Sequence, residues 1–468
     1  MRKDALAFLL CTCLLEAGCD EASPVAEAHA PPPSGAPAKK SAPKKELDKK
    51  QPDKPRVYSK VRFLWIRPQI GSENWIGYLS LGDSVPIKAV AADGKSERCD
   101  QWYKLDPVGY VCTGEDATVD PKDPLIVELV AHRANDSPWP YEYGESLGLP
   151  IFHELPTGDR LAALAPDDKP TGNAPPKLLS FDLPTAGRPI LHKIIPMSTV
   201  AYRGAFDHEG RSFLMTWDIG IVPKSKVKPY PRSKFQGVKL GAEHKLPIAF
   251  FRGSAKPQYR RTASGFAKTG KEWPRLAWVE LTGQKVDDYF ETRDGKLWVA
   301  EEDAAIARQA DELPAQLPRD GRRTWIDISI LGGTLVAYEG EKAVYATLIS
   351  PGRGGVPLPG VPTLETASTP TGTYPIVGKF HTATMFSSSN SDIMHTEVMY
   401  TQNFSGPYAL HGAYWHDDWG NKKSGGCVNL SPLDSHFMFH WTEPPVPEGW
   451  HGMKTQDFKP KTLVRLGR

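Results

Sequence analysis

The chain has 468 residues, of which 40% are hydrophobic and 24% are charged, and its formal net charge is +2. This length exceeds what a single core usually holds, so about two to four domains are expected, with the composition of an ordinary globular protein. The near-neutral charge argues against nucleic acid as a partner, and the lack of any run of eighteen apolar residues predicts no membrane-spanning helix.

The N-terminus has the pattern of an export signal. A basic start and an apolar run from Ala5 to Leu15, too short to span a bilayer, predict a signal peptide over residues 1–19. The ending "LLEAGC" resembles a bacterial lipobox, which implies lipidation of Cys19 and a periplasmic protein anchored to a membrane. Glu16 departs from the apolar residue that is usual there, and cleavage of a plain signal peptide nearby is the alternative.

Residues 20–57 are rich in Pro, Ala and Lys and nearly free of large apolar side chains. Such a segment cannot bury enough surface to fold, so we predict a disordered tether. Its lysines could contact anionic headgroups or wall polymers, and a simple solvated spacer is the alternative.

Residues 58–120 predict short strands with turns between apolar runs. The segment resembles a bacterial SH3-like barrel, whose patterns often include a hairpin of the kind "WYKL…GYV". In an oxidising compartment two of the three cysteines beyond the signal would pair. Cys99 and Cys112 flank the hairpin, so we predict a disulfide between them, which leaves Cys427 unpaired.

Residues 121–317 give a weaker signal. Several stretches alternate apolar and polar residues, and Asp294-Gly295 is a good hairpin turn. We predict a β-rich accessory region and assign it no chemistry.

Residues 322–468 complete a mainly β, multi-domain chain. "TWIDISILGGTLVAYEGEKAVYATLIS" predicts two or three antiparallel strands, and "TEVMYTQNFSGPYALHG" predicts a hairpin that places His411 at a strand end. Helix signals appear only after the cysteine, where Ser431-Pro432-Leu433-Asp434 matches an N-cap, a first-turn proline and an acid of capping-box type. We therefore predict one short helix there.

The segment "HGAYWHDDWGNKKSGGCVNL" places a histidine sixteen residues before the unpaired thiol. A free thiol is only a few per cent ionised at neutral pH, and a neighbouring imidazole raises that fraction. His411 is therefore the candidate base for a Cys427 nucleophile. Attack on an amide carbonyl builds negative charge on oxygen, and the amides of Gly425 and Gly426, beside that of Cys427, are candidates for the oxyanion hole.

The blocks "STPTGTYPI", "ALHGAYWHDDWG" and "SGGCVNLSP" together resemble the catalytic domain of the YkuD family of L,D-transpeptidases. The resemblance implies that Cys427 is the nucleophile, that His411 is the base, and that the Gly412 carbonyl orients the imidazole. Ser424 and Asn429 match the serine and asparagine of the family motif. The family usually has Ser-His-Gly-Cys, whereas this chain has glycine at 425, so a degenerate, non-catalytic domain is an alternative.

Other side chains of this segment are candidates for contact with substrate. The resemblance suggests that Tyr414, Trp415 and His416 shape the substrate groove, and Tyr400 could line its donor side. A metal site built from the histidines, Asp417, Asp418 and Cys427 is also conceivable, but the spacing fits no standard zinc pattern. We therefore predict no metal ligands and no cofactor.

The resemblance implies a peptidoglycan L,D-transpeptidase that is acylated by a stem peptide and cross-links third-position diamino acids. It also implies inhibition by carbapenems. The same acyl-enzyme with water or a protein amine as acceptor would be a carboxypeptidase, an endopeptidase or a wall-anchoring enzyme. An alternative of a different class is a wall-binding scaffold with a vestigial thiol.

Overall fold

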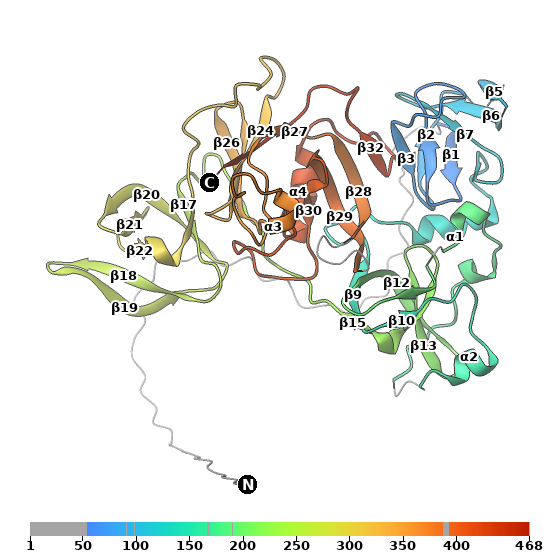
Figure 1. Cartoon of the computed structure of the whole chain (residues 1–468), viewed down its shortest axis with the longest axis horizontal. Coiled ribbons are helices and arrows are strands. Elements are labelled where there is room, and N and C mark those ends of the chain that lie inside the picture. Colours follow the sequence, from blue (N-terminus) through green and yellow to red (C-terminus); the bar gives the residue numbers. More distant parts are fainter. Residues whose placement is uncertain are drawn as a thin grey trace, which may run out of the picture.

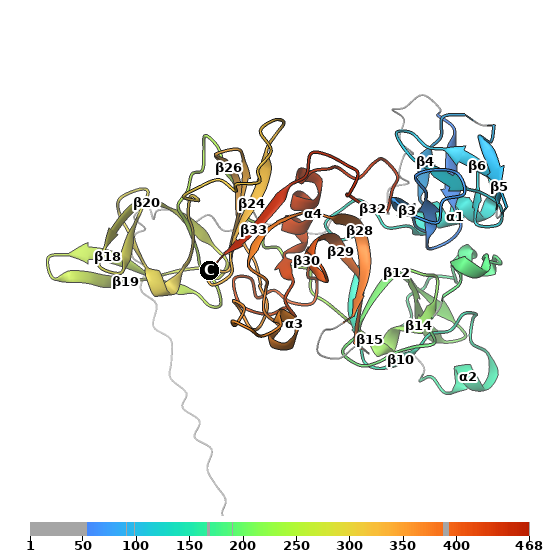
Figure 2. The same cartoon turned by 45° about the horizontal axis from the view of Figure 1, so that its top comes forward.

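The structure is a computed structural model, which describes residues 54–467 except 90, 98, 166–168, 190 and 387–392. The predicted signal peptide, Cys19 and most of the predicted tether lie outside the described residues. Strands dominate and are organised in several sheets, which confirms the mainly β, multi-domain prediction. The C-terminal part lies in the centre, with the segment of β17 to β23 on one side and the two more N-terminal segments, one above the other, on the opposite side (Figures 1 and 2).

Two sheets build the central part. The first has six strands in the order β16-β26-β25-β24-β33-β27, and the second has seven in the order β2-β3-β32-β28-β29-β30-β31. The strands of the first are β16 (Val238–Lys239), β24 (Thr324–Ser329), β25 (Thr334–Glu339), β26 (Lys342–Leu348), β27 (Gly372–Pro375) and β33 (Leu463–Gly467). Those of the second are β2 (Leu64–Ile66), β3 (Gly77–Leu79), β28 (Gly378–Phe386), β29 (Met394–Ser405), β30 (Tyr408–Gly412), β31 (Val428–Leu430) and β32 (Gly452–Lys454).

The predicted strand pairs of this part are present. β24, β25 and β26 pair antiparallel in sequence order, and β29 and β30 form the predicted hairpin that ends at His411. β33 then returns to the sheet parallel to β24, and this pairing closes the C-terminal end of the chain onto the strand that begins the domain.

One helix, α4 (Pro432–Trp441), begins where the sequence predicted it. The Ser431 hydroxyl accepts the Asp434 N–H at 3.0 Å, and proline occupies the first turn. The Asp434 carboxylate is fully buried and accepts hydrogen bonds from Gly237, Tyr345 and Thr347, which ties α4 to the six-stranded sheet.

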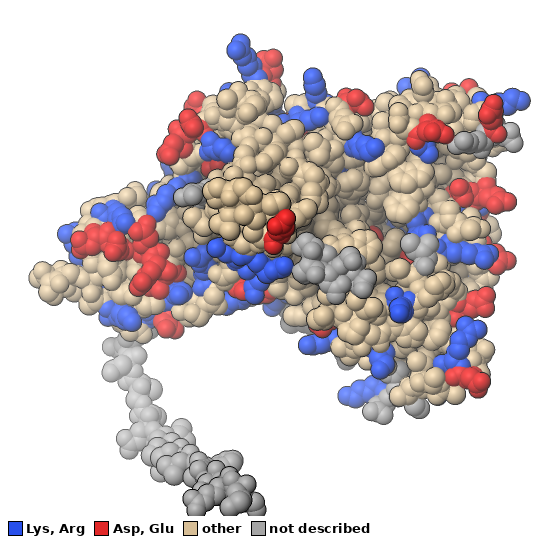
Figure 3. Space-filling view, viewed as in Figure 1, with Lys and Arg blue, Asp and Glu red and all other residues tan. Residues whose placement is uncertain are grey.

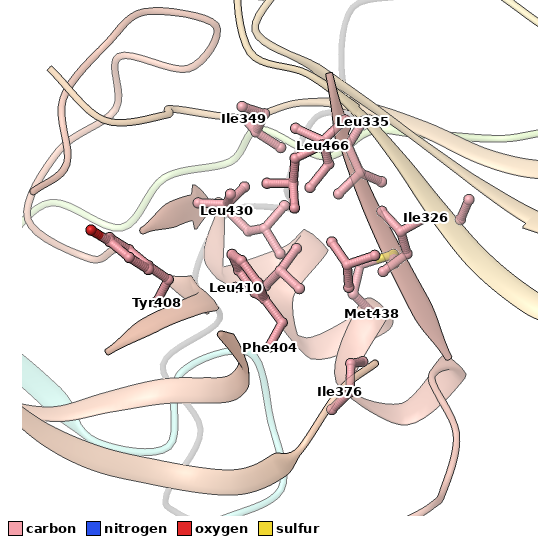
Figure 4. Packing of buried hydrophobic residues seen from close by; sticks show 14 of the residues in the cluster. Ile326, Leu335, Ile349, Ile376, Phe404, Tyr408, Leu410, Leu430, Met438 and Leu466 are labelled. Carbon is pink, nitrogen blue, oxygen red and sulfur yellow. The ribbon is translucent and has the colours of Figure 1, made fainter. Parts of the chain in front are cut away.

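The main core fills the space between the two sheets and α4. Ile326 and Leu335 of the first sheet meet Leu410 and Leu430 of the second, and Met438 of α4 packs among them (Figure 4). β30 and β31, the strands that carry the candidate site, are therefore anchored on one face by a packed apolar layer.

The N-terminal unit comprises β1 to β8 and shares a core and a sheet with the central part. Its core includes Trp450 and Met453 of the central part, and β3 pairs with β32, so that β2 and β3 extend the seven-stranded sheet. Cys99 and Cys112 form a disulfide beside the β6–β7 hairpin. The remaining strands are β1 (Arg56–Ser59), β4 (Ser84–Pro86), β5 (Gly94–Ser96), β6 (Cys99–Lys104), β7 (Tyr110–Cys112) and β8 (Ala117–Thr118).

The accessory region divides into two units at opposite ends of the molecule (Figure 1). The α1–β15 unit holds a five-stranded sheet in the order β14-β13-β12-β9-β15, and the β17–β23 unit holds a seven-stranded sheet. The first comprises α1 (Pro124–His132), β9 (Glu142–Ser146), β10 (Leu149–Pro150), α2 (Gly158–Ala162), β11 (Lys193–Ile194), β12 (Thr199–His208), β13 (Arg211–Thr216), β14 (Ile221–Pro223) and β15 (Val227–Pro229). The second comprises β17 (Ile248–Phe250), β18 (Lys256–Thr262), β19 (Gly265–Trp273), β20 (Trp278–Val286), β21 (Tyr289–Thr292), β22 (Trp298–Ala300) and β23 (Ala305–Ala307).

Helix α1 was not predicted, although its signals are present. The Asp123 side chain accepts hydrogen bonds from the amides of Leu125 and Ile126, and Pro124 occupies the first turn.

Charged side chains of both signs are interspersed over the face shown in Figure 3, in keeping with the small net charge. Among the described residues, no helix combines the length and apolar character needed to cross a membrane.

Candidate active site

Two neighbouring strands bring the predicted catalytic residues together. β30 and β31 pair in parallel, with His411 opposite Asn429, and Cys427 immediately precedes β31. In this register the residue before β31 lies beside the last part of β30, so the histidine and the thiol reach one region although sixteen residues separate them. Cys427 is half-buried and unpaired, whereas His411 is only 3% exposed.

His411 and Cys427 line one cavity of about 780 Å³, which we name the catalytic cavity. Ser424, Gly425, Trp415 and Asn429 line it as well. The other units complete its wall: the N-terminal unit contributes the aromatic wall of Phe63, Trp65, Trp75 and Tyr78, and the α1–β15 unit contributes Leu191, Trp217 and Asp218.

The imidazole of His411 is oriented by the next residue. Its Nδ1 lies 3.2 Å from the Gly412 carbonyl oxygen, which can only accept a hydrogen bond. In the neutral ring Nδ1 therefore carries the hydrogen, and Nε2 has the free lone pair of a base. This geometry gives Gly412 the place that the family resemblance suggested.

The resting pair is neutral rather than ionised. Burial lowers the pKa of His411 to about 4, and burial raises the pKa of the Cys427 thiol above its ordinary value, against the opposing effect of the Ala409 N–H. The sequence-based expectation of a thiol held ionised by imidazole is therefore corrected, because low polarity disfavours both charges. A neutral pair can still react if His411 removes the thiol proton during attack.

The loop before the cysteine is braced by Ser424. Its hydroxyl accepts the Gly426 N–H at 3.0 Å and donates to the Cys427 carbonyl at 2.5 Å. The Gly426 amide is thus already engaged, which argues against its predicted place in an oxyanion hole. Ser424, 8% exposed, contacts the loop at these two points, and the amides of Gly425 and Cys427 are the stronger oxyanion candidates.

Glycine is required at position 426 but not at position 425. Gly426 has φ of +129°, and a Cβ there would lie 2.5 Å from the Tyr408 ring and 2.9 Å from the Ser368 carbonyl oxygen. Gly425 is not among the glycines with positive φ, and it lines the cavity. The departure from the family's usual histidine therefore falls at the more permissive of the two positions.

We expect Gly425→His to be tolerated and Gly426→Ala not to be. The first change should alter the free energy of unfolding by less than about 1 kcal/mol, and the second should lower it by on the order of 3 kcal/mol through strain and crowding. Chemical denaturation of both variants checks this. Equal destabilisation by the two changes would contradict the assigned backbone geometry.

Tyr400 and Tyr414 do not line the catalytic cavity. Both are at most 2% exposed and pack in an aromatic cluster with residues of the α1–β15 unit. The Tyr400 hydroxyl donates to the Ser137 carbonyl at 2.5 Å, and that of Tyr414 donates to the Thr396 carbonyl at 2.6 Å. Their predicted contact with substrate is therefore corrected, since contacts between units bury them.

The remaining predicted residues fall into two groups. Trp415 and Asn429 line the cavity, and His416 supports Asn429 through a contact of 3.2 Å between its Nε2 and the Asn429 Nδ2. The two acidic residues of the segment do not line the cavity and form ion pairs instead. Asp417 pairs with Arg275 at 3.0 Å and Asp418 pairs with Lys423 at 2.9 Å.

Three cationic side chains in the cavity wall were missed from the sequence, namely Arg62, Arg353 and Lys423. Arg353 is held beside the nucleophile loop because its backbone N–H donates to the Ser424 carbonyl at 2.9 Å. Arg353 follows "SPG", a turn signal without functional content, so only the fold reveals its proximity to Cys427.

Residues 323–458 match the family model described as the L,D-transpeptidase catalytic domain, YkuD. This part of the chain is similar to the YkuD L,D-transpeptidase catalytic domain. The match agrees with the family resemblance for the central part and covers both Cys427 and His411.

Solved structures of L,D-transpeptidases resemble the chain at low identity. They include an L,D-transpeptidase from Xylanimonas cellulosilytica (21% identity, 32% of this chain, 63% of that chain, TM-score 0.22). L,D-transpeptidase 3 from Mycobacterium tuberculosis is 19% identical, and the match covers 31% of this chain and 61% of that chain with a TM-score of 0.23. The catalytic domain of the E. faecium L,D-transpeptidase is 21% identical, and the match covers 31% of this chain and 98% of that chain with a TM-score of 0.22. The chain thus spans less than two thirds of the first of these relatives. The search of curated proteins gives no match.

Proposed function

We propose that this chain is an exported peptidoglycan L,D-transpeptidase that works through a thioester on Cys427. The observation that carries the proposal is the shared cavity of Cys427 and a neutral, oriented His411 within the YkuD domain. Export itself rests on the signal pattern of residues 1–19, and the lipid on Cys19 belongs to the same proposal.

In the acylation step, the Cys427 sulfur attacks the carbonyl carbon of the third residue of a tetrapeptide stem. His411 Nε2 takes the thiol proton and delivers it to the amine of the terminal D-alanine as the C–N bond breaks. The amides of Gly425 and Cys427 stabilise the oxyanion that forms in between. The product is a thioester, and D-alanine leaves.

In the second step, the side-chain amine of another stem attacks the thioester. The amine loses a proton to His411, the C–S bond breaks, and the regained proton returns to the thiolate of Cys427. This gives a cross-link between two third-position diamino acids. None of these steps is routed through a metal or an organic cofactor.

The cavity suits a large substrate with both carboxylates and amines. The stem has free carboxylates, and Arg353 places positive charge beside the loop of Cys427. Lys423, by contrast, is already paired with Asp418, and the acids Asp218 and Glu397 also line the cavity. In the part of the wall that the N-terminal unit supplies, Trp65 and Trp75 lie 5.0 Å apart between ring centroids, and Phe63 stacks on Trp65 at 5.3 Å. Such an aromatic wall offers apolar surface to sugar rings or to the stem, which supports a substrate that spans more than one unit.

The proposal is tested with defined muropeptides. The purified protein and disaccharide-tetrapeptide should give a tetrapeptide–tripeptide dimer that mass spectrometry detects, together with free D-alanine. Tripeptide without dimer would assign water as the acceptor, and failure of any conversion together with failure of carbapenem acylation would favour a wall-binding scaffold.

The neutral resting pair predicts a low acid limit of activity. His411 acts as base only when unprotonated, and its pKa of about 4 lies below the ordinary value of 6.5. Acylation by a carbapenem should therefore stay constant as pH falls through 6.5 and halve near pH 4. Stopped-flow acylation rates between pH 3.5 and about 8 check this. A fall of the acylation rate with a midpoint near pH 6.5 would contradict a buried, neutral His411.

A further inference from the structure

A group of three potential metal ligands lies outside the catalytic cavity. His436 and His440 project from α4, and Asp136 comes from the loop between α1 and β9 of another unit. Their ligand atoms all lie within 4.8 Å of one another. None of the three lines the catalytic cavity, so the group has no part in the proposed chemistry.

The two histidines are spaced as a metal pair on a helix. Residues i and i+4 lie on one face of a helix, and the Nε2 atoms of His436 and His440 approach the same carboxylate oxygen, Oδ1 of Asp136, at 3.3 and 2.9 Å. A zinc ion bound at about 2.0–2.2 Å separates neighbouring tetrahedral ligands by roughly 3.3–3.5 Å. The two nitrogen–oxygen distances are therefore near the spacing that zinc requires, and the two nitrogens lie within 4.8 Å of each other.

The surroundings hold these side chains in place. The ring of Tyr400 meets that of His436 edge-on at 5.0 Å between centroids, and the Tyr400 hydroxyl bonds the Ser137 carbonyl next to Asp136. The His436 Nε2 atom is shielded from solvent and has no hydrogen-bond partner of good geometry. Ligands oriented by their neighbours, and a buried ring nitrogen whose hydrogen-bonding capacity is not used, are both features of a metal site.

The location also favours a cation. His440 lies in the last turn of α4, where the partial negative charge of the helix end attracts positive charge. Asp136 and His440 are 61% and 42% exposed, which leaves one side of the group open to water. Three protein ligands and one water complete a tetrahedral set.

We propose that Asp136, His436 and His440 bind a divalent transition metal, with zinc as the fitting ion, and that the ion joins the α1–β15 unit to the catalytic domain. The α1–β15 unit supplies Trp217 and Asp218 to the catalytic cavity. The ion thus fixes one wall of that cavity from outside. Its binding is independent of the proposed transpeptidase activity.

The test is zinc binding by the full chain carrying Cys427→Ser, since a free thiol beside His411 could itself bind zinc. After chelator treatment, calorimetric titration with zinc chloride should show that the protein binds one equivalent of zinc. The affinity for this zinc should be lower by roughly 100-fold or more in His440→Ala and in Asp136→Ala. His153→Ala, which removes an exposed histidine elsewhere, is the matched control and should keep that equivalent. Zinc should raise the melting temperature of the parent and the control only.

Cobalt in place of zinc distinguishes this site from a thiolate site. Cobalt bound by the parent protein should show visible d–d bands without a sulfur charge-transfer band, and these bands should be absent in His440→Ala. Circular dichroism establishes that each variant is folded, and His436→Gln provides a second variant that should also lose the equivalent. Equal zinc affinity in parent and His440→Ala overturns the site, and undiminished affinity in Asp136→Ala overturns the link between the units.

Discussion

Replacing Cys427 with alanine should abolish acylation by a carbapenem and all cross-linking of muropeptides. No other free thiol lies among the described residues, and without a nucleophile the thioester cannot form. Loss of a catalytic nucleophile typically lowers the rate by about 10⁴-fold or more. Intact-mass spectrometry should show one added drug mass on the wild type and none on the variant.

The variant should remain folded, because Cys427 is half-buried and alanine fits the same backbone. Its melting temperature and its circular dichroism spectrum serve as controls. Acylation of a folded Cys427→Ala protein would assign the nucleophile to another residue and would contradict the placement of the active site at this loop.

Replacing His411 with alanine should slow acylation by on the order of 100-fold or more while the thiol remains in place. The resting thiol is protonated, since burial raises its pKa, so attack depends on a base that removes the proton. His411 is the residue whose free Nε2 faces this task, because its Nδ1–H is directed to the Gly412 carbonyl. Stopped-flow measurement of the carbapenem adduct gives the rate.

His208→Ala provides the control for loss of a histidine that does not line the catalytic cavity. An unchanged acylation rate in His411→Ala would mean that another base operates. A rate that falls at neutral pH but recovers fully at high pH would be expected, because hydroxide then generates the thiolate without a base.

The sequence predicted the parts of the site that depend on local signals. Cys427 was recognisable because the other two cysteines beyond the signal could pair, and the N-cap at Ser431 and the hairpin ending at His411 follow from short-range rules. The strands β24 to β26 were recognisable from their apolar residues, although both of their faces are packed, one on the main core and the other on a second apolar cluster.

Features that depend on contacts between distant segments could not be predicted in this way. Tyr400 and Tyr414 look like groove residues until the α1–β15 unit covers them, and Arg353 gains its place only through β-structure around Ser424. By contrast, the bonds of the Ser424 hydroxyl to the Gly426 N–H and the Cys427 carbonyl are local, and in the sequence Ser424 stood out only through the family motif. The His436 and His440 spacing was visible, but its third partner, Asp136, is some three hundred residues away.

The covalent intermediate itself provides the most direct test of the account. Wild-type protein mixed with disaccharide-tetrapeptide and quenched in acid should carry a disaccharide-tripeptide acyl group on the peptide that contains Cys427. One D-alanine should appear for each adduct in the first turnover. Release of D-alanine with no adduct on Cys427, or with the adduct on another residue, would contradict the proposed mechanism.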